Sequence, residues 1–268
     1  MNILKEIAER TKERIEEKKK LVSIDEVINT AKSMCDPMGV EHDFPFEKAL
    51  KQPDIAFICE VKKASPSKGV IDQDFPYLDI AKSYEKAGAA AISVLTEPFY
   101  FKGSDDYLRE IAAEVKIPLL RKDFTVDSYM IYEAKLLGAS AVLLICGMLD
   151  WDALAEYINI AHGLGLSALV ETHDDDEVSM ALSAGARIVG VNNRNLKTFQ
   201  VDISTSQNLR PLVPSDVTFV SESGITTPEH VNRMREIGAD AVLIGESIMR
   251  SPDKEAAIAA LRGLSCQK

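Results

Sequence analysis

The sequence predicts an α/β fold, a (β/α)8 barrel with a helical extension at its N-terminus, and two observations indicate this class. Short β-branched apolar runs alternate with helical patterns from about residue 50 onward in the 268-residue chain. A weak repeat also places a glycine after each of four helical patterns and before an apolar run, at Gly88, Gly138, Gly185 and Gly238. These glycines stand about 50 residues apart, at the position where glycine commonly ends a helix.

Each of the four glycines is followed by one apolar run, and each repeat also contains a second apolar run. Counting both runs in each of the four repeats gives eight strands. The predicted strands are 55–61, 90–95, 117–121, 141–146, 167–171, 187–191, 217–221 and 241–245. Eight alternating βα units are typical of a TIM barrel. A doubly wound open sheet is the alternative, but it usually has fewer strands and a glycine fingerprint after the first one. No GxGxxG occurs in this sequence.

Helical patterns fill the intervals between the strands. Apolar residues recur at three- and four-residue spacing in Ser128–Leu137 and in Asp152–His162. A last helix is predicted to open at Ser251, with Ser251 as the N-cap candidate and Pro252 at the first helical position.

The residues before the first strand predict two further helices. Leu4, Ile7 and Ile15 are separated by charged residues, which indicates an amphipathic helix. A second helix is predicted over Ser23–Ala31, with Ser23 as its N-cap. This extension could cover the bottom of the barrel or border its active site. We expect one domain over residues 1–268, with the extension at 1–48 and the barrel at 49–268.

The composition is acidic, with 42 Asp and Glu against 31 Lys and Arg and a net charge of −11. This balance disfavours nucleic acid as a partner, because phosphate binding draws on a basic surface. No apolar run is long enough to span a membrane, and the charged segment Met1–Leu21 lacks the apolar region of a signal peptide. Cys35, Cys59, Cys146 and Cys266 are widely spaced, which predicts reduced thiols and no cysteine metal site. We therefore expect a cytoplasmic protein.

Ionisable residues stand where several apolar runs end, and barrels of this class place the active site at the carboxyl ends of their strands. Glu60, Lys62, Lys122 and Glu171 occupy such positions. Glu60 and Lys62 are two residues apart, so they point to the same face of an extended strand. The alternatives are a structural ion pair for Glu60 and Lys62, and an ordinary polar strand end for each position.

The neighbours of these candidates are interpreted as ordinary structure. For Arg121 and Asp123 a solvated turn is the simplest alternative. The acids of segment 174–177 are typical of the first turn of a helix, where the macrodipole favours negative charge, rather than of a metal site. The four histidines show no ligand spacing, and we expect them at the surface or in caps: His42, His162, His173 and His230. Neither HExxH nor a nucleophile-elbow serine occurs.

Glycine-containing segments follow the last two predicted strands, at Ser221–Ile225 and Ile244–Ser247. Glycine lets backbone N–H groups approach an anion closely, and the loops after strands seven and eight are the usual phosphate site of these barrels. The sequence therefore predicts phosphate binding by Ser223, Gly224 and Gly245, with ordinary turn glycines as the alternative.

Ordered motifs over residues 50–250 resemble the indole-3-glycerol phosphate synthase family, and the helical N-terminal extension also fits it. The motifs are Glu60–Gly69, Leu95–Glu97, Phe101–Ser104, Leu120–Phe124, Leu169–Glu171, Gly190–Leu196, Ser221–Ile225 and Ile244–Ser247. The first of these and Gly190–Leu196 are the most specific to the family. The resemblance implies a carbon–carbon carboxy-lyase of tryptophan biosynthesis. Such an enzyme converts 1-(2-carboxyphenylamino)-1-deoxyribulose 5-phosphate to indole-3-glycerol phosphate, with loss of CO₂ and water.

The resemblance also implies partners and cofactors. It implies a small phosphorylated substrate and no metal or organic cofactor. We expect a monomer that contacts neither nucleic acid nor membrane, with contact to other tryptophan-pathway enzymes as a further possibility. We also expect no fused isomerase barrel, which some members of the family carry.

Site residues are carried over by position. The expected catalytic residues are Glu60, Lys62, Lys122, Glu171, Asn192 and Ser223. Lys122 is the general acid toward the ketone, its pKa brought down by burial, Lys62 and Arg194, and Glu171 is the general base. The division of roles between Lys62 and Lys122, and between Glu60 and Glu171, stays open. The expected substrate-binding residues are Ser65, Phe101, Phe124, Leu143, Arg194, Gly224, Leu243, Gly245 and Glu246.

Two rival functions share these features in part. A phosphoribosylanthranilate isomerase would use the same barrel and phosphate loops, but it has no use for a benzoate-binding lysine on the first strand. A non-catalytic protein that binds a phosphorylated ligand would have no requirement for Glu60, Lys62, Lys122 and Glu171. The motif that begins at Glu60 therefore favours the synthase.

Overall fold

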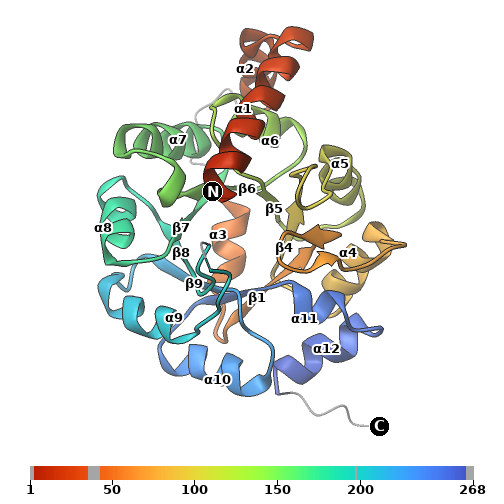
Figure 1. Cartoon of the computed structure of the whole chain (residues 1–268), viewed down its shortest axis with the longest axis vertical. Helices are drawn as coiled ribbons and strands as arrows, with labels where there is room; N and C mark the ends of the chain where they lie inside the picture. Colours follow the sequence, from red (N-terminus) through yellow and green to blue (C-terminus); the bar gives the residue numbers. More distant parts are fainter. Residues whose placement is uncertain (1–2, 36–42, 197, 264–268) are drawn as a thin grey trace.

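The structure, a computed structural model, describes residues 3–35, 43–196 and 198–263 and contains a closed barrel of eight parallel strands. Around the barrel the order is β1-β10-β9-β8-β7-β6-β5-β4, so each strand pairs with its neighbours along the chain. Helices surround the strands (Figure 1). The strands are β1 Ala56–Val61, β4 Ala91–Leu95, β5 Leu119–Lys122, β6 Ala141–Ile145, β7 Ser167–Thr172, β8 Ile188–Asn192, β9 Thr218–Glu222 and β10 Ala241–Ile244. The predicted (β/α)8 barrel is confirmed, and every predicted strand begins and ends within two residues of an observed one.

A small antiparallel hairpin after β1 is not among the predicted elements. It pairs β2 (Ala64–Ser65) with β3 (Gly69–Val70). Strands of two residues show no periodicity in a sequence, so pattern reasoning does not find them. The hairpin places Ser65 and the residues of its turn over the carboxyl end of the barrel.

Helices follow the barrel strands as the repeat predicts. They are α4 Tyr77–Lys86, α5 Asp105–Glu114, α6 Tyr129–Leu136, α7 Trp151–Gly163, α8 Asp175–Ser183, α9 Ser204–Leu209, α10 Pro228–Glu236, α11 Glu246–Met249 and α12 Lys254–Leu261, with short 3-10 turns η1 Cys146–Met148 and η2 Arg210–Leu212. The four repeat glycines have φ between 72° and 91°, a left-handed conformation that ends a helix without a Cβ clash. No helix among the described residues is both long and apolar enough to cross a membrane.

Three helix starts test the capping predictions. Ser23 caps the second helix, accepting a hydrogen bond from the N–H of Glu26, as predicted. The acidic segment also opens a helix as predicted, with Asp174 as the N-cap of α8. The prediction for the last helix is wrong, because Asp253 caps α12 through the N–H of Ala256, while Ser251 donates to the Asp253 carbonyl. Both residue types cap well, but a carboxylate also interacts favourably with the helix dipole.

Apolar side chains pack in two layers, one inside the barrel and one between strands and helices. Ile58 points into the barrel, whereas Cys59 and Val61 belong to the outer layer, as strand alternation predicts. Helix α3 (Pro45–Leu50) closes the amino end of the barrel with Phe46 and Leu50, both fully buried. The predicted boundary at residue 48 falls inside this helix.

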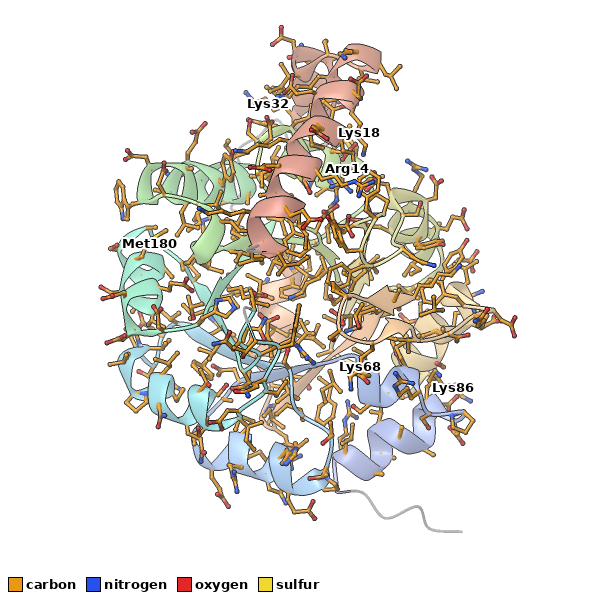
Figure 2. All side chains as sticks on the ribbon, viewed as in Figure 1. Arg14, Lys18, Lys32, Lys68, Lys86 and Met180 are labelled. Carbon is orange, nitrogen blue, oxygen red and sulfur yellow. The ribbon has the colours of Figure 1, made fainter. Side chains whose placement is uncertain are left out.

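Helices α1 (Ile3–Leu21) and α2 (Ile24–Ser33) form the extension, and α1 borders the carboxyl end of the barrel (Figure 1). Ile3, Leu4 and Ile7 of α1 line the pocket described below. Further along α1, Arg14 and Lys18 (Figure 2) bind acids of the barrel. Of the two predicted placements, α1 therefore takes the one beside the strand ends, whereas residues 45–48 of the predicted extension lie in α3 at the bottom of the barrel.

The contacts of α1 belong to a buried ion-pair network centred on Arg121. The guanidinium of Arg121 donates to Asp105 and Glu133 at 2.7 Å each and is 2% exposed. Arg14 donates to both carboxylate oxygens of Asp123 at 2.9 Å, and Lys18 pairs with Asp105 and Glu133. Arg121 and Asp123 are both buried, so the alternative of a solvated turn is wrong. Strand alternation turns Lys122 into the barrel mouth and both neighbours toward the packed helices, where their charges are paired.

The network should give stability a specific acid dependence. Burial would raise the pKa of Asp105, but Arg121 and Lys18 outweigh it and lower the pKa to about 2. A depressed carboxyl pKa contributes stability above its unfolded value near 4, and this contribution is lost as pH falls through about 2. We expect Asp105→Asn to be about 2 kcal/mol less stable than wild type at pH 7, with the difference shrinking between pH 4 and pH 2.

The measurement is urea unfolding of both proteins across that pH range. Asp106→Asn is the matched control, because Asp106 is an exposed neighbour on the same helix and pairs with exposed Arg109. A difference between wild type and Asp105→Asn that stays constant with pH would contradict the assigned role of the network.

Candidate active site

A pocket of about 740 Å³ opens at the carboxyl ends of the strands, bordered by α1 and the β2–β3 hairpin. The structure brings together every side chain and glycine expected in the site. The residues lining this pocket include Glu60, Lys62, Ser65, Phe101, Lys122, Phe124, Leu143, Glu171, Asn192, Arg194, Ser223, Gly224, Leu243, Gly245 and Glu246.

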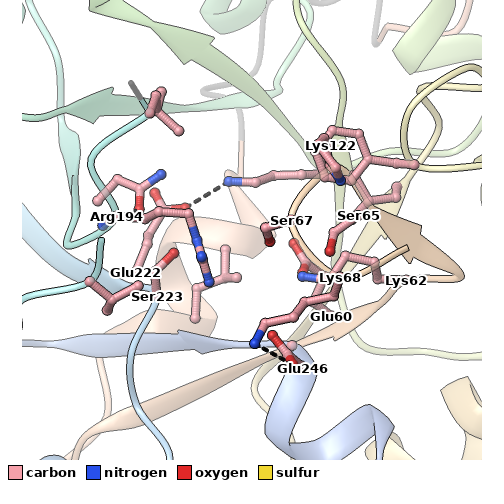
Figure 3. Close-up of a pocket in the computed structure, with 18 of the residues that line it drawn as sticks. Glu60, Lys62, Ser65, Ser67, Lys68, Lys122, Arg194, Glu222, Ser223 and Glu246 are labelled. Atoms are coloured by element: carbon pink, nitrogen blue, oxygen red, sulfur yellow. Dashed lines mark hydrogen bonds and ion pairs between the residues drawn. The ribbon is translucent and has the colours of Figure 1, made fainter. Parts of the chain in front are cut away.

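The centre of the pocket is a buried lysine held by two glutamates. Lys122 Nζ lies 2.7 Å from Glu222 Oε2 and 3.2 Å from Glu171 Oε2. Figure 3 shows Lys122 extending across the pocket toward the side where Glu222 lies. Beside them Lys62 is ion-paired with Glu60. Both glutamates that hold Lys122 are at most 4% exposed, so each charge depends on its partner rather than on water.

These groups come from alternate strands of the barrel. Glu60 is on β1, Lys122 on β5, Glu171 on β7 and Glu222 on β9. In a barrel of this class, alternate strands contribute one layer of inward-pointing side chains. The four ionisable groups therefore form one layer at the mouth of the barrel, and Leu169, two residues before Glu171 on β7, belongs to the apolar interior below it.

The pKa of Lys122 is raised, so the expectation of a lowered pKa is wrong. Burial disfavours the charged form, but the charges of Glu222, Glu171 and Glu60 outweigh burial. The expected cause was repulsion from Lys62 and Arg194. The atoms that lie against Lys122 Nζ are instead carboxylate oxygens, and opposite charges at this distance favour the ammonium form.

The two glutamates have pKa values that are pushed apart. Burial raises the pKa of Glu222 to about 7, with Glu171 and Glu60 adding to the rise and Lys122 opposing it. Burial also acts on Glu171, but Lys122, His173 and Asn192 outweigh it and lower the pKa of this carboxyl. When the pKa values of two carboxyl groups differ in this way, one group can serve as the acid and the other as the base at the same pH.

Glu222 is the main residue that sequence reasoning missed. It stands directly after the predicted seventh strand, among the ionisable residues at strand ends, but it was assigned no role beside the phosphate loop that follows it. Its Oε1 accepts no hydrogen bond from the residues that the structure describes. The signal that could have found it is the one that found Glu171, an acid at the end of an apolar run in an odd-numbered strand.

Two glycines make room for this charged layer. A Cβ at Gly190 on β8 would collide with Glu222 Oε1, and a Cβ at Gly245 would collide with Glu60 Oε2 and lie 2.9 Å from Lys62 Nζ. Gly245 was expected only as a phosphate-loop glycine. The structure shows that it also admits the Glu60–Lys62 pair.

The loop after β9 has a conformation suited to an anion. Ser223 and Gly224 have φ of 66° and 83°, and consecutive left-handed residues bend the backbone around a concave turn. Buried Asn193 fixes this turn by donating to the carbonyl of Ser223 at 3.0 Å. Across the pocket, Glu246 faces Lys68 at 3.8 Å (Figure 3) and Arg250 at 3.1 Å, so its charge is offset by two cations.

An apolar wall faces the charged layer. The rings of Phe101 and Phe124 stand 5.9 Å apart, and Leu143 and Leu243 line the same pocket. Asn192 and Arg194 lie at the end of β8 and just beyond it, where Asn192 donates to Glu171 Oε1 at 3.1 Å. The pocket is therefore not simply cationic, although lysines and arginines line it. Glutamates alternate with cations, and one side is aromatic.

The fold and this lysine–carboxylate layer define a (β/α)8-barrel enzyme with its site at the strand ends. The family model for indole-3-glycerol phosphate synthase matches residues 4–261, and the chain belongs to this family. The protein of that name from Ruminiclostridium cellulolyticum is 60% identical over 97% of this chain and 99% of its own length. The one from Lachnoclostridium phytofermentans is 49% identical over 98% of this chain and 99% of its own.

Solved structures show the same fold at much lower sequence identity. The 3-hexulose-6-phosphate synthase of Salmonella typhimurium matches with a TM-score of 0.64, covering 80% of this chain and 99% of its own. The two sequences are 16% identical, so the likeness concerns the barrel fold alone.

The Gly190–Glu222 contact can be tested by substitution. We expect Gly190→Ala to fold but to displace the Glu222 carboxylate, because the added methyl group occupies the space of Oε1. The expected consequence is a loss of turnover of roughly tenfold or more, since a small misplacement of a reacting group is costly.

A crystal structure and steady-state kinetics of the variant check this prediction. Gly163→Ala is the matched control, because a Cβ at Gly163 meets nothing within 4 Å. Unchanged turnover in Gly190→Ala, with Glu222 in place, would show that the close approach has no consequence.

Proposed function

We propose that this chain closes the indole ring of 1-(2-carboxyphenylamino)-1-deoxyribulose 5-phosphate, giving indole-3-glycerol phosphate with loss of CO₂ and water. One observation carries the mechanism: a buried ammonium, Lys122, lies between two carboxyl groups whose pKa values differ. The family membership and the names of close relatives support the reaction. The assignment of each step to a residue is argued from the pocket.

The substrate has a phosphate at one end and a benzoate at the other, and the pocket offers a complement to each. The turn at Ser223 and Gly224, with Gly245 opposite, suits the phosphate. Phe101 and Phe124 suit the aromatic ring. Lys62, which pairs with Glu60, can turn to the benzoate carboxylate.

Ring closure requires negative charge to form on the ketone oxygen while the ring carbon attacks the carbonyl carbon. A charged Lys122 stabilises that oxygen electrostatically in a site with little water. As the carbonyl becomes an alkoxide, its basicity rises, and the Nζ proton passes to it. Loss of CO₂ from the ring carbon that made the attack then restores the aromatic electrons.

Dehydration requires one proton donor and one acceptor. Glu222, with a pKa of about 7, can protonate the departing hydroxyl group so that it leaves as water. Glu171, ionised and oriented by Asn192, can remove the proton from the adjacent carbon. Glu60 holds Lys62 and adds negative charge around Lys122.

We also propose the domain organisation, the localisation and the oligomeric state of this enzyme. The extension and barrel act as one domain, which is supported by the pocket contacts of Ile3, Leu4 and Ile7 on α1. We propose a cytoplasmic monomer that acts on this one small substrate, consistent with the acidic composition. Contact with other enzymes of the pathway remains part of the proposal.

An assay with the carboxyphenylamino-deoxyribulose phosphate tests the function directly. Wild type should produce the fluorescence of an indole, and Lys122→Met should lower kcat by roughly 10²-fold or more. Lys82→Met is the control, because Lys82 is half exposed on α4 and pairs with Glu114.

No indole product from wild type would reject the synthase. Isomerisation of phosphoribosylanthranilate would then favour the isomerase, and binding without turnover would favour a non-catalytic protein. Product formation with near-normal kcat in Lys122→Met would keep the synthase and remove Lys122 from its role.

A further inference from the structure

His173 is a titratable group beside Glu171 that the mechanism above does not use. It follows β7 directly, and its Nε2 lies 3.5 Å from Glu171 Oε1. This Nε2 is buried and makes no hydrogen bond within the described part of the chain. The sequence suggested a surface or capping role, since the histidines show no ligand spacing and none falls at the end of an apolar run. The structure instead turns the imidazole toward the proposed base.

Glu177 of α8 holds the other side of the ring. Glu177 Oε2 lies 3.0 Å from His173 Nδ1 and also accepts the backbone N–H of His173 at 2.8 Å. An ionised carboxylate only accepts hydrogen bonds, so Nδ1 carries a proton. The N–H of Glu177 donates to the N-cap, Asp174, at 2.9 Å. The start of α8 therefore fixes the orientation of the imidazole.

The protonation of Nε2 decides the charge of the His173 ring. With Nδ1 protonated, Nε2 has either a lone pair or a second proton. A lone pair facing the carboxylate of Glu171 would be repelled, whereas an N–H would be attracted. Burial lowers the pKa of His173, but the hydrogen bond to Glu177 and the charges of Glu171 and Glu177 outweigh it and raise the pKa. The imidazolium is the form that fits both neighbours.

Charged and titratable groups around the imidazole come from several elements. Glu171 faces it from β7, Glu177 from α8 and Glu222 from β9. Lys122 of β5 acts on it through Glu171, which it contacts. The thiol of Cys146 in η1 donates to the Glu177 carbonyl and stays neutral, since burial raises its pKa to about 12. Most of the charged groups around the imidazole are carboxylates, and this again favours a protonated ring.

We propose that His173 is a positioning residue: its imidazolium, held by Glu177, orients the Glu171 carboxylate and keeps it ionised while it acts as base. The inference rests on the proposed function, because that function makes Glu171 the base. Asn192 and His173 then both face Oε1. Oε2, which contacts Lys122, is left to meet the substrate.

The test is the pH dependence of kcat in His173→Asn, which removes the charge and keeps a side-chain hydrogen-bond donor. The acid-side midpoint of the profile should move to higher pH by roughly half a unit to one unit, because the ionised form of Glu171 loses a favourable charge. KM should change less than twofold. Glu177→Gln should shift the midpoint in the same direction by less, because it keeps an acceptor for Nδ1 but removes the charge that favours the imidazolium, so that His173 is protonated in a smaller fraction of the molecules. His162→Asn is the control, since His162 packs edge-to-face on Phe44 and does not line the pocket.

Each outcome bears on a different claim. No product from wild type would reject the proposed function. Turnover by wild type with an acid-side midpoint that His173→Asn leaves unchanged would overturn this inference alone. If His173→Asn does not fold, imidazole nitrogen NMR of wild type decides between the two forms. An imidazolium at pH 7 supports the proposal, and a neutral ring with the ordinary pKa near 6.5 overturns it.

Discussion

The contact of Lys122 with Glu171 and Glu222 is the interaction on which the rest of the site depends. Three ionised or ionisable groups lie out of water at the mouth of the barrel, and each would be costly alone. Before the reaction Lys122 is charged and Glu171 is ionised, whereas Glu222 exchanges its proton near neutral pH, so the three groups can take different roles in acid–base chemistry. Their proximity follows from the alternation of barrel strands, which brings distant parts of the sequence into one layer.

The surrounding structure meets the demands of this layer. Gly190 and Gly245 provide space that side chains would fill. On the outer side of β5, the Arg121 network ties α5, α6 and α1 to the strand that carries Lys122. The extension thus does two things, since α1 lines the pocket and also pairs with acids of the barrel. One face of β5 therefore carries Lys122 of the site, and the opposite face carries Arg121 of the ion-pair network.

Much of the architecture was predictable because periodicity is a local signal. The eight strands, the helix-ending glycines and the same-face placement of Glu60 and Lys62 all follow from spacing. Charge states were not predictable, because they depend on which groups meet across the barrel. The raised pKa of Lys122 and the burial of Arg121 and Asp123 result from partners up to 109 residues away. His173 was missed for the same reason, whereas Glu222 has a local signal, an acid at the end of a strand, that was given no role.

The measurement that tests the central claim most directly is a carboxyl-carbon NMR titration of wild-type protein, with Glu222→Gln to assign the signal. The account predicts a glutamate signal with a midpoint near pH 7 that disappears in the variant. A second glutamate, Glu171, should stay ionised below the ordinary pKa of this side chain. If both carboxyl groups titrated together near pH 4 to 5, the separation of acid and base would be absent, and the proposed division of roles would be contradicted.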